Sequence, residues 1–182
     1  MLRAPGFHTG RHFVRVARPD DLADAARALP GDTLSVIAHL DARGADGRFR
    51  KYRVMIVDRG LYPLHLAVSA DWKVHYFTAD MAGSAAHRAE DAAFLADMPG
   101  AIGARGLAAL QAIAEALALD YGGIDFGLSP AGDILFFEAN ATMAVYPPMI
   151  DPKWAYRRPA VERIVAAAQT MLIERARGAG AR

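Results

Sequence analysis

The chain has 182 residues, of which 53% are hydrophobic and 23% are charged, and its formal net charge is +1. This length and composition are typical of one globular domain with a substantial core. The near-zero charge gives no reason to expect binding to nucleic acid or to an anionic membrane surface. The absence of cysteine excludes disulfides, a thiol nucleophile and a cysteine-based zinc site. No apolar run reaches the ~18 residues of a membrane span, and we expect a cytoplasmic protein.

The first forty residues predict short elements around a polar loop. A loop that contains His8, Thr9 and Gly10 lies within residues 2–16 and leads into a short strand. Residues 19–29 follow with apolar side chains at helical spacing, and residues 34–40 indicate a strand. On its residues alone, the loop is more typical of an ordinary hairpin turn than of an anion site.

A β-hairpin is predicted for residues 51–69, where two β-rich runs flank the turn signal Asp58-Arg59-Gly60. Side-chain alternation places Lys51, Arg53 and Met55 on one face of its first strand. Without further context, Arg53 is typical of an ordinary exposed arginine on a strand. A short run that contains Lys73 and His75 follows this hairpin.

Three helices are predicted in the second half of the chain. The first spans residues 89–98 and is expected to stop at Pro99-Gly100, the second spans residues 104–119, and the last spans residues 160–175. Because helices and hairpins alternate irregularly, the pattern predicts an α+β domain. We expect an antiparallel β-sheet with helices packed on one face and the functional site on the other.

The most informative stretch is residues 122–143, GGIDFGLSPAGDILFFEANATM. Its two apolar runs, residues 124–129 and 134–139, predict a hairpin closed by a four-residue turn. With Ser129 opposite Ile134, Asp125 lies directly opposite Glu138. Alternation then places Asp125, Gly127, Glu138 and Asn140 on one face, and Ile124, Phe126, Leu128, Leu135 and Phe137 on the other. A five-residue loop would instead place Asp125 and Glu138 on opposite faces.

Two carboxylates directly opposite each other repel unless something compensates their charge. A divalent cation would do so, because Mg²⁺ prefers oxygen ligands and is commonly held by one or two carboxylates together with phosphate and water. The alternative from the residues alone is a solvated hairpin face with ordinary surface acids.

The sequence Gly-Ile-Asp-Phe-Gly, a turn, and then Phe-Glu-Ala-Asn-Ala-Thr-Met resembles the C-terminal metal-binding hairpin of the ATP-grasp superfamily, the glutathione-synthetase-like carboxylate–amine ligases. The resemblance runs over most of the chain and implies the C-terminal half of the ATP-grasp fold. It implies that Asp125, Glu138 and Asn140 hold Mg²⁺, or alternatively Mn²⁺, which bridges the phosphates of ATP.

The same resemblance implies roles for residues outside the hairpin. Arg53 and Lys73 would stabilise the transferred phosphoryl group. The nucleotide would be bound by these two residues and by Arg3, His8, Thr9, Gly10, His39, Leu40 and Phe137. On the residues alone, His39 could as easily be a structural histidine.

By this resemblance, residues 1–182 form a single ATP-grasp-like domain. Residues 1–40 would be a remnant of the small nucleotide lobe, residues 41–150 the metal- and phosphate-binding sheet, and residues 151–182 the C-terminal helix and tail. The implied function is an ATP- and Mg²⁺-dependent ligase domain that joins a small carboxylate to an amine through an acyl-phosphate.

Because the sequence lacks the N-terminal lobe of such ligases, we expect a fragment of a longer enzyme. The lobe would be supplied by the same longer chain or by a partner, and a homodimer is also open. The alternative is a non-catalytic nucleotide- or protein-binding module derived from the same fold.

Overall fold

The computed structural model describes residues 1–7, 10–76 and 78–179, and it divides into two compact units, Met1–Asp41 and Ala42–Arg182. The elements of the first unit are the strands β1 (Leu2–Arg3), β2 (Phe13–Val14) and β3 (Ser35–Val36), the 3₁₀ helix η1 (Pro19–Asp21) and the helix α1 (Leu22–Arg27). The strand predicted at residues 34–40 is therefore much shorter, because its partner β1 offers only Leu2 and Arg3 for pairing.

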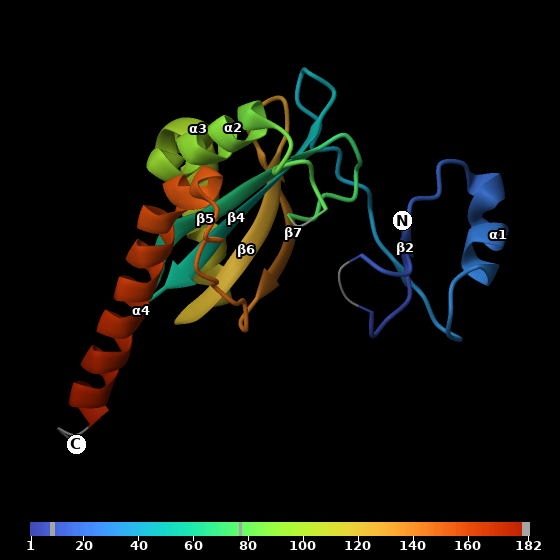
Figure 1. Ribbon diagram of the computed structural model, residues 1–182. Helices are drawn as coiled ribbons and strands as arrows, with labels where there is room; N and C mark the ends of the chain where they lie inside the picture. Colours follow the sequence, from blue (N-terminus) through green and yellow to red (C-terminus); the bar gives the residue numbers. More distant parts are fainter. Residues whose placement is uncertain (8–9, 77, 180–182) are drawn as a thin grey trace. The chain divides into compact units, whose positions relative to one another are not determined.

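The second unit is built on a four-stranded antiparallel sheet in the order β5-β4-β6-β7 (Figure 1). Its strands are β4 (Phe49–Val57), β5 (Gly60–Ser69), β6 (Tyr121–Leu128) and β7 (Ile134–Asn140). Its helices are α2 (Ala85–Ala96), α3 (Met98–Leu117), the 3₁₀ helix η2 (Pro152–Arg157) and α4 (Arg158–Ala179). This mixture of helices with an antiparallel sheet confirms the predicted α+β class.

The two faces of the sheet bury different helices. Tyr52, Val54 and Ile56 alternate onto the face that packs against α2 and α3 in the larger hydrophobic core. Met55 and Val57 lie on the opposite face, where they pack with residues of α4 in a second, smaller core. The expected packing on one face therefore describes α2 and α3, whereas α4 covers part of the other face.

The expected stop at Pro99-Gly100 is instead the start of α3. The helix α2 ends at Ala96, and α3 begins at Met98 with Pro99 in its first turn, where a missing N–H costs nothing. The Asp97 carboxylate accepts a hydrogen bond from Gly100 N at 2.9 Å and so caps the new helix. Gly103 has φ of 72° and interrupts α3 close to the predicted start at residue 104.

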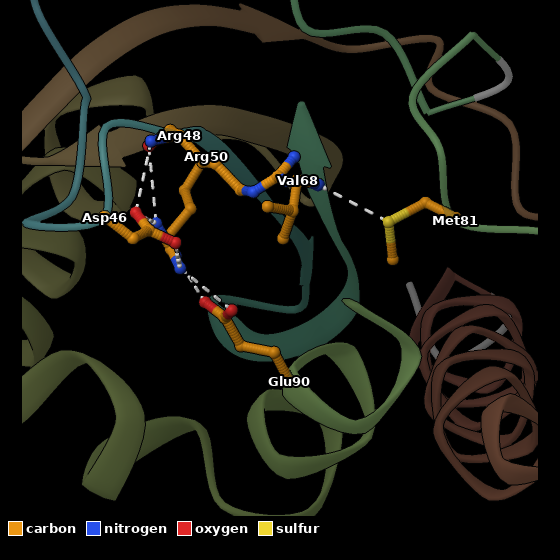
Figure 2. A network of polar contacts seen from close by, with 6 residues as sticks. All are labelled: Asp46, Arg48, Arg50, Val68, Met81 and Glu90. Carbon is orange, nitrogen blue, oxygen red and sulfur yellow. Dashed lines mark hydrogen bonds and ion pairs between the residues drawn. The ribbon is translucent and has the colours of Figure 1, made fainter. Parts of the chain in front are cut away.

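The edge of the sheet at β5 is covered by buried groups from α2 and its preceding loop. Asp91 has no exposed surface and accepts hydrogen bonds from Leu66 N at 2.7 Å and from the Tyr156 hydroxyl at 2.6 Å. Val68 N donates to Met81 Sδ at 3.4 Å (Figure 2). These bonds satisfy backbone donors that an open edge would leave unpaired.

A second polar contact joins α2 to the start of β4. The Arg50 guanidinium donates to Glu90 on α2 at 2.5 and 3.0 Å and to Asp46 at 2.9 and 3.0 Å (Figure 2). Because two carboxylates share this one cation, Arg50 is fully engaged in holding the loop that precedes β4 against α2.

The variant Tyr156→Phe should destabilise the chain by about 1–3 kcal/mol, because it removes a donor from the buried Asp91 carboxylate. The matched variant Tyr146→Phe alters a tyrosine that is 69% exposed and should change stability by less than about 0.5 kcal/mol. Urea unfolding of both variants measures the difference. Equal stabilities would show that Asp91 does not depend on this hydroxyl.

Asp91 also predicts a pH dependence of stability. Burial raises the pKa of Asp91 to about 6, although the bonds from Tyr156 and Leu66 N oppose the shift. Between about pH 4 and pH 6 the native carboxyl keeps a proton that the unfolded chain releases, so its contribution to stability falls as the pH rises. The native chain should lose on the order of 2 kcal/mol relative to Asp91→Asn across this window in urea unfolding. Parallel pH profiles would contradict the assignment.

Candidate functional site

Four polar side chains form one row across the sheet. His65 on β5 pairs with Arg53 on β4, Arg53 pairs with Asp125 on β6, and Asp125 pairs with Glu138 on β7. We call His65, Arg53, Asp125 and Glu138 the charged row. Lys51 lies two residues before Arg53 and therefore shares its face of β4. The predicted pairing of Asp125 with Glu138 is confirmed.

This pairing arises from a different loop than predicted. Leu128 pairs with Ile134, which leaves a five-residue loop from Ser129 to Asp133. The Ser129 hydroxyl accepts hydrogen bonds from Ala131 N at 3.2 Å and Asp133 N at 3.1 Å, which stabilise the longer loop. A β-bulge on β7, at Phe137, then shifts the register by one residue and brings Asp125 opposite Glu138.

The longer loop overturns the predicted face of Leu135, and the bulge overturns that of Phe137. Leu135 pairs with Gly127 and so lies on the Asp125 face, not on the core face. A Cβ atom at Gly127 would lie 2.9 Å from Phe137 Cζ and 2.5 Å from Ala42 Cβ, so the Phe137 ring also covers this face. At 37% exposure, Phe137 offers an aromatic surface on the same face as the charged row.

Asp125 is the buried centre of this face, with 1% exposure. Its Oδ1 accepts from Arg53 Nε at 2.5 Å, and its Oδ2 accepts from Arg53 Nη2 at 2.7 Å and from Lys51 Nζ at 2.9 Å. Burial by itself would raise the pKa of Asp125, but the Arg53 hydrogen bond and the charges of Lys51 and Arg53 lower it below its ordinary value. Asp125 is therefore ionised, and both of its oxygens are engaged.

The other two predicted metal ligands are more accessible. Glu138 is exposed, and within the part of the chain that the structure describes it forms no ion pair. Asn140 is exposed and pairs with Gly123, which lies two residues before Asp125 and therefore on the same face of β6. The Asn140 Oδ1 accepts from Thr142 N at 2.7 Å and from the Thr142 hydroxyl at 2.9 Å.

These three residues supply the hard oxygen atoms that suit Mg²⁺. Within residues 1–7, 10–76 and 78–179, however, no group of three or more His, Cys, Asp or Glu side chains is placed to hold a metal ion. The predicted set includes only two side chains of these types, Asp125 and Glu138, and a bare divalent ion would have to approach a carboxylate that two positive groups already neutralise. The donor set therefore fits a metal ion that is accompanied by an anion, because the anion would pair with Lys51 and Arg53 in place of Asp125.

Histidines lie at the β5 end of the charged row. His65 is 6% exposed, and its Nε2 has no hydrogen-bond partner among the described residues. Burial, together with the nearby charges of Arg53, Arg157 and Lys51, lowers the pKa of His65 well below its ordinary value, so it is neutral. The Tyr76 ring packs on it with centroids 4.4 Å apart. Burial and the charges of Lys51 and Arg53 also lower the pKa of the adjacent His75.

The remaining predicted residues lie outside the four strands of this sheet. Lys73 is exposed, and its ammonium lies 5.7 Å from the centroid of the Trp72 ring. Arg3, Gly10, His39 and Leu40 belong to the first unit, where Arg3 Nη2 donates to Phe7 O at 3.0 Å and Gly10 has φ of 73°. His8 and Thr9 fall outside the described residues.

Two members of the site, Lys51 and His65, were not among the predicted site residues. Alternation had already placed Lys51 on the face of Arg53, and a buried carboxylate on the neighbouring strand was the missing reason to include it. His65 stands out only once its pairing with Arg53 is known, because the β4–β5 register shifts between Arg53 and Val54.

The variant Asp125→Asn should lower the free energy of unfolding by about 2–4 kcal/mol, because Lys51 and Arg53 lose the charge that compensates them. Asp120→Asn is a matched control, since Asp120 is also paired with an arginine but is 56% exposed, and it should cost less than about 1 kcal/mol. Urea unfolding at pH 7 compares the two. A small, equal cost for both variants would contradict a structural role for the Asp125 ion pairs.

Comparisons with protein-family models, curated proteins and solved structures find no match for this chain. The resemblance to ATP-grasp ligases therefore rests on the residues quoted above. Among the described residues, no helix has both the length and the apolar character needed to cross a membrane.

Proposed function

We propose that this chain binds ATP together with Mg²⁺ on the face of the charged row, as the nucleotide-binding part of a carboxylate–amine ligase. The observation that carries the proposal is the direct pairing of Asp125 with Glu138, flanked by the cations Lys51 and Arg53. A face with two carboxylates and two cations offers oxygen ligands for a metal ion and donors for phosphate oxygens.

Each residue has a defined part in this proposal. Asp125, Glu138 and Asn140 would hold Mg²⁺, which when bound supplies Lewis acidity and neutralises phosphate charge. Arg53 presents a planar guanidinium, which suits bidentate contact with a phosphoryl group, and Lys51 adds a second positive charge beside it. The exposed Phe137 ring offers an apolar surface on the same face.

The proposed reaction has two steps. A carboxylate oxygen of the first substrate forms a bond to the γ-phosphorus of ATP, and the bond from that phosphorus to the ADP oxygen breaks. The amine nitrogen of the second substrate then attacks the acyl carbon, phosphate leaves, and the amine loses a proton. Arg53 and the predicted residue Lys73 would stabilise the negative charge of the transferred group.

A module that binds nucleotide without catalysis is the second candidate. The observation that favours it is that both Asp125 oxygens already accept hydrogen bonds from Lys51 and Arg53, so the two cations are paired within the chain. Formation of ADP when carboxylates and amines are added with MgATP would support the ligase, whereas binding without ADP formation would favour the module.

Calorimetric titration of the 182-residue chain with ATP in the presence of Mg²⁺ should show binding that Glu138→Gln weakens at least tenfold. The reason is that this exposed carboxylate would be lost as a metal ligand while the fold stays intact. Glu162→Gln, which changes an exposed glutamate on α4, is the matched control and should bind like the native chain. No binding by a folded native chain, or equal binding by Glu138→Gln, would contradict the proposed site.

A further inference from the structure

We propose that the ion pairs on Asp125 make this site take up a divalent cation and a polyphosphate only together, and that Lys51 sets this coupling. The inference rests on the proposed function, since it concerns the same face. It concerns the energetics of the empty site, in which Asp125 is buried and both of its oxygens already accept hydrogen bonds from cations.

A divalent cation alone should bind weakly at Asp125 and Glu138. Asp125 and Glu138 attract it, but Lys51 and Arg53 repel it with the same number of charges, so the four side chains present no net charge. To ligate Asp125, the cation would also have to displace hydrogen bonds of 2.5 to 2.9 Å from a carboxylate with 1% exposure. The released Lys51 and Arg53 would then lie partly buried without a counter-charge.

A polyphosphate alone meets the converse difficulty. Its oxygens could attract Lys51 and Arg53, whose side chains are 14% and 22% exposed. Those cations can turn to the phosphate only by leaving Asp125, which would keep its negative charge beside a second anion. Glu138 adds further repulsion on the same face.

The two ligands together remove both difficulties. The metal ion compensates Asp125 and Glu138, while the phosphate oxygens compensate Lys51 and Arg53, so every charge exchanges one partner for another. The ion pairs of the free chain therefore act as internal substitutes for the metal and the phosphate. A metal ion on Asp125 frees Lys51 and Arg53 for phosphate, and a phosphate on Lys51 and Arg53 frees Asp125 for the metal ion.

Lys51 is the residue that best exposes this coupling. Arg53 contacts both oxygens of Asp125, whereas Lys51 makes a single bond to Oδ2, which Arg53 Nη2 also contacts. Lys51→Met keeps an unbranched side chain on β4 and leaves Asp125 paired with Arg53, so the fold should persist. The substitution also changes the summed charge of residue 51, Arg53, Asp125 and Glu138 from zero to net negative.

The experiment measures Mn²⁺ binding by the free-ion electron paramagnetic resonance signal, and ATP binding by calorimetry in EDTA and with excess Mg²⁺. The native chain should bind MgATP at least a hundredfold more tightly than it binds either Mn²⁺ alone or ATP in EDTA. Tight binding of either ligand alone would overturn the coupling but leave the proposed function standing. Absence of binding under all three conditions would overturn the proposed function and the coupling with it.

Lys51→Met should bind Mn²⁺ alone at least tenfold more tightly than the native chain and should bind MgATP at least tenfold more weakly. Lys153→Met is the matched control, because Lys153 pairs with Asp151 on a different segment, and it should match the native chain in both measurements. Circular dichroism confirms that each variant is folded. A folded Lys51→Met variant with unchanged Mn²⁺ affinity would overturn the role of Lys51.

Discussion

The structure of the second unit depends on one buried carboxylate and the two cations that neutralise it. Asp125 lies in the interior of a four-stranded sheet, and its ionised form is tolerated there because Lys51 and Arg53 on the neighbouring strand donate to both of its oxygens. These bonds also join β4 to β6, in which Arg53 and Asp125 are register partners. The same charges make this face the candidate functional site.

The sheet face that carries Asp125 is only partly covered by apolar packing, so one end of it is polar. Opposite it, the larger core packs α2 and α3 against β4, β5 and β6, while α4 covers Met55 and Val57 near the other end of the strands. Gly123, one pleat from Asp125, lacks a side chain where the Met143 sulfur packs. The apolar cover therefore ends next to Asp125, and Glu138 on the edge strand β7 remains exposed. The result is a partly buried charged row that ends in the accessible carboxylate of Glu138.

Much of this arrangement could be predicted from local sequence patterns. Turn signals identified both hairpins, and alternation placed Lys51 with Arg53. The four-residue loop placed Asp125 opposite Glu138, and the structure has this pairing through a longer loop and a bulge. The five-residue loop was only the alternative to the predicted one, and bonds to the Ser129 hydroxyl stabilise it. The compensating bulge at Phe137 could not be predicted, because it depends on packing over Gly127. The partners of Asp125 were missed for a different reason. They come from residues 72 and 74 positions earlier, so the hairpin alone indicated two uncompensated carboxylates.

The most direct test follows the Arg53 Nε–H signal by ¹H–¹⁵N NMR while Mg²⁺, ATP and then both are added to the chain. The account predicts that the hydrogen bonds from Arg53 to Asp125 persist with either ligand alone and break only when metal and phosphate bind together. The signal should therefore keep its position with either ligand alone and shift when both are present. A shift with Mg²⁺ alone would show that the cation reaches Asp125 unaided, and it would contradict the account.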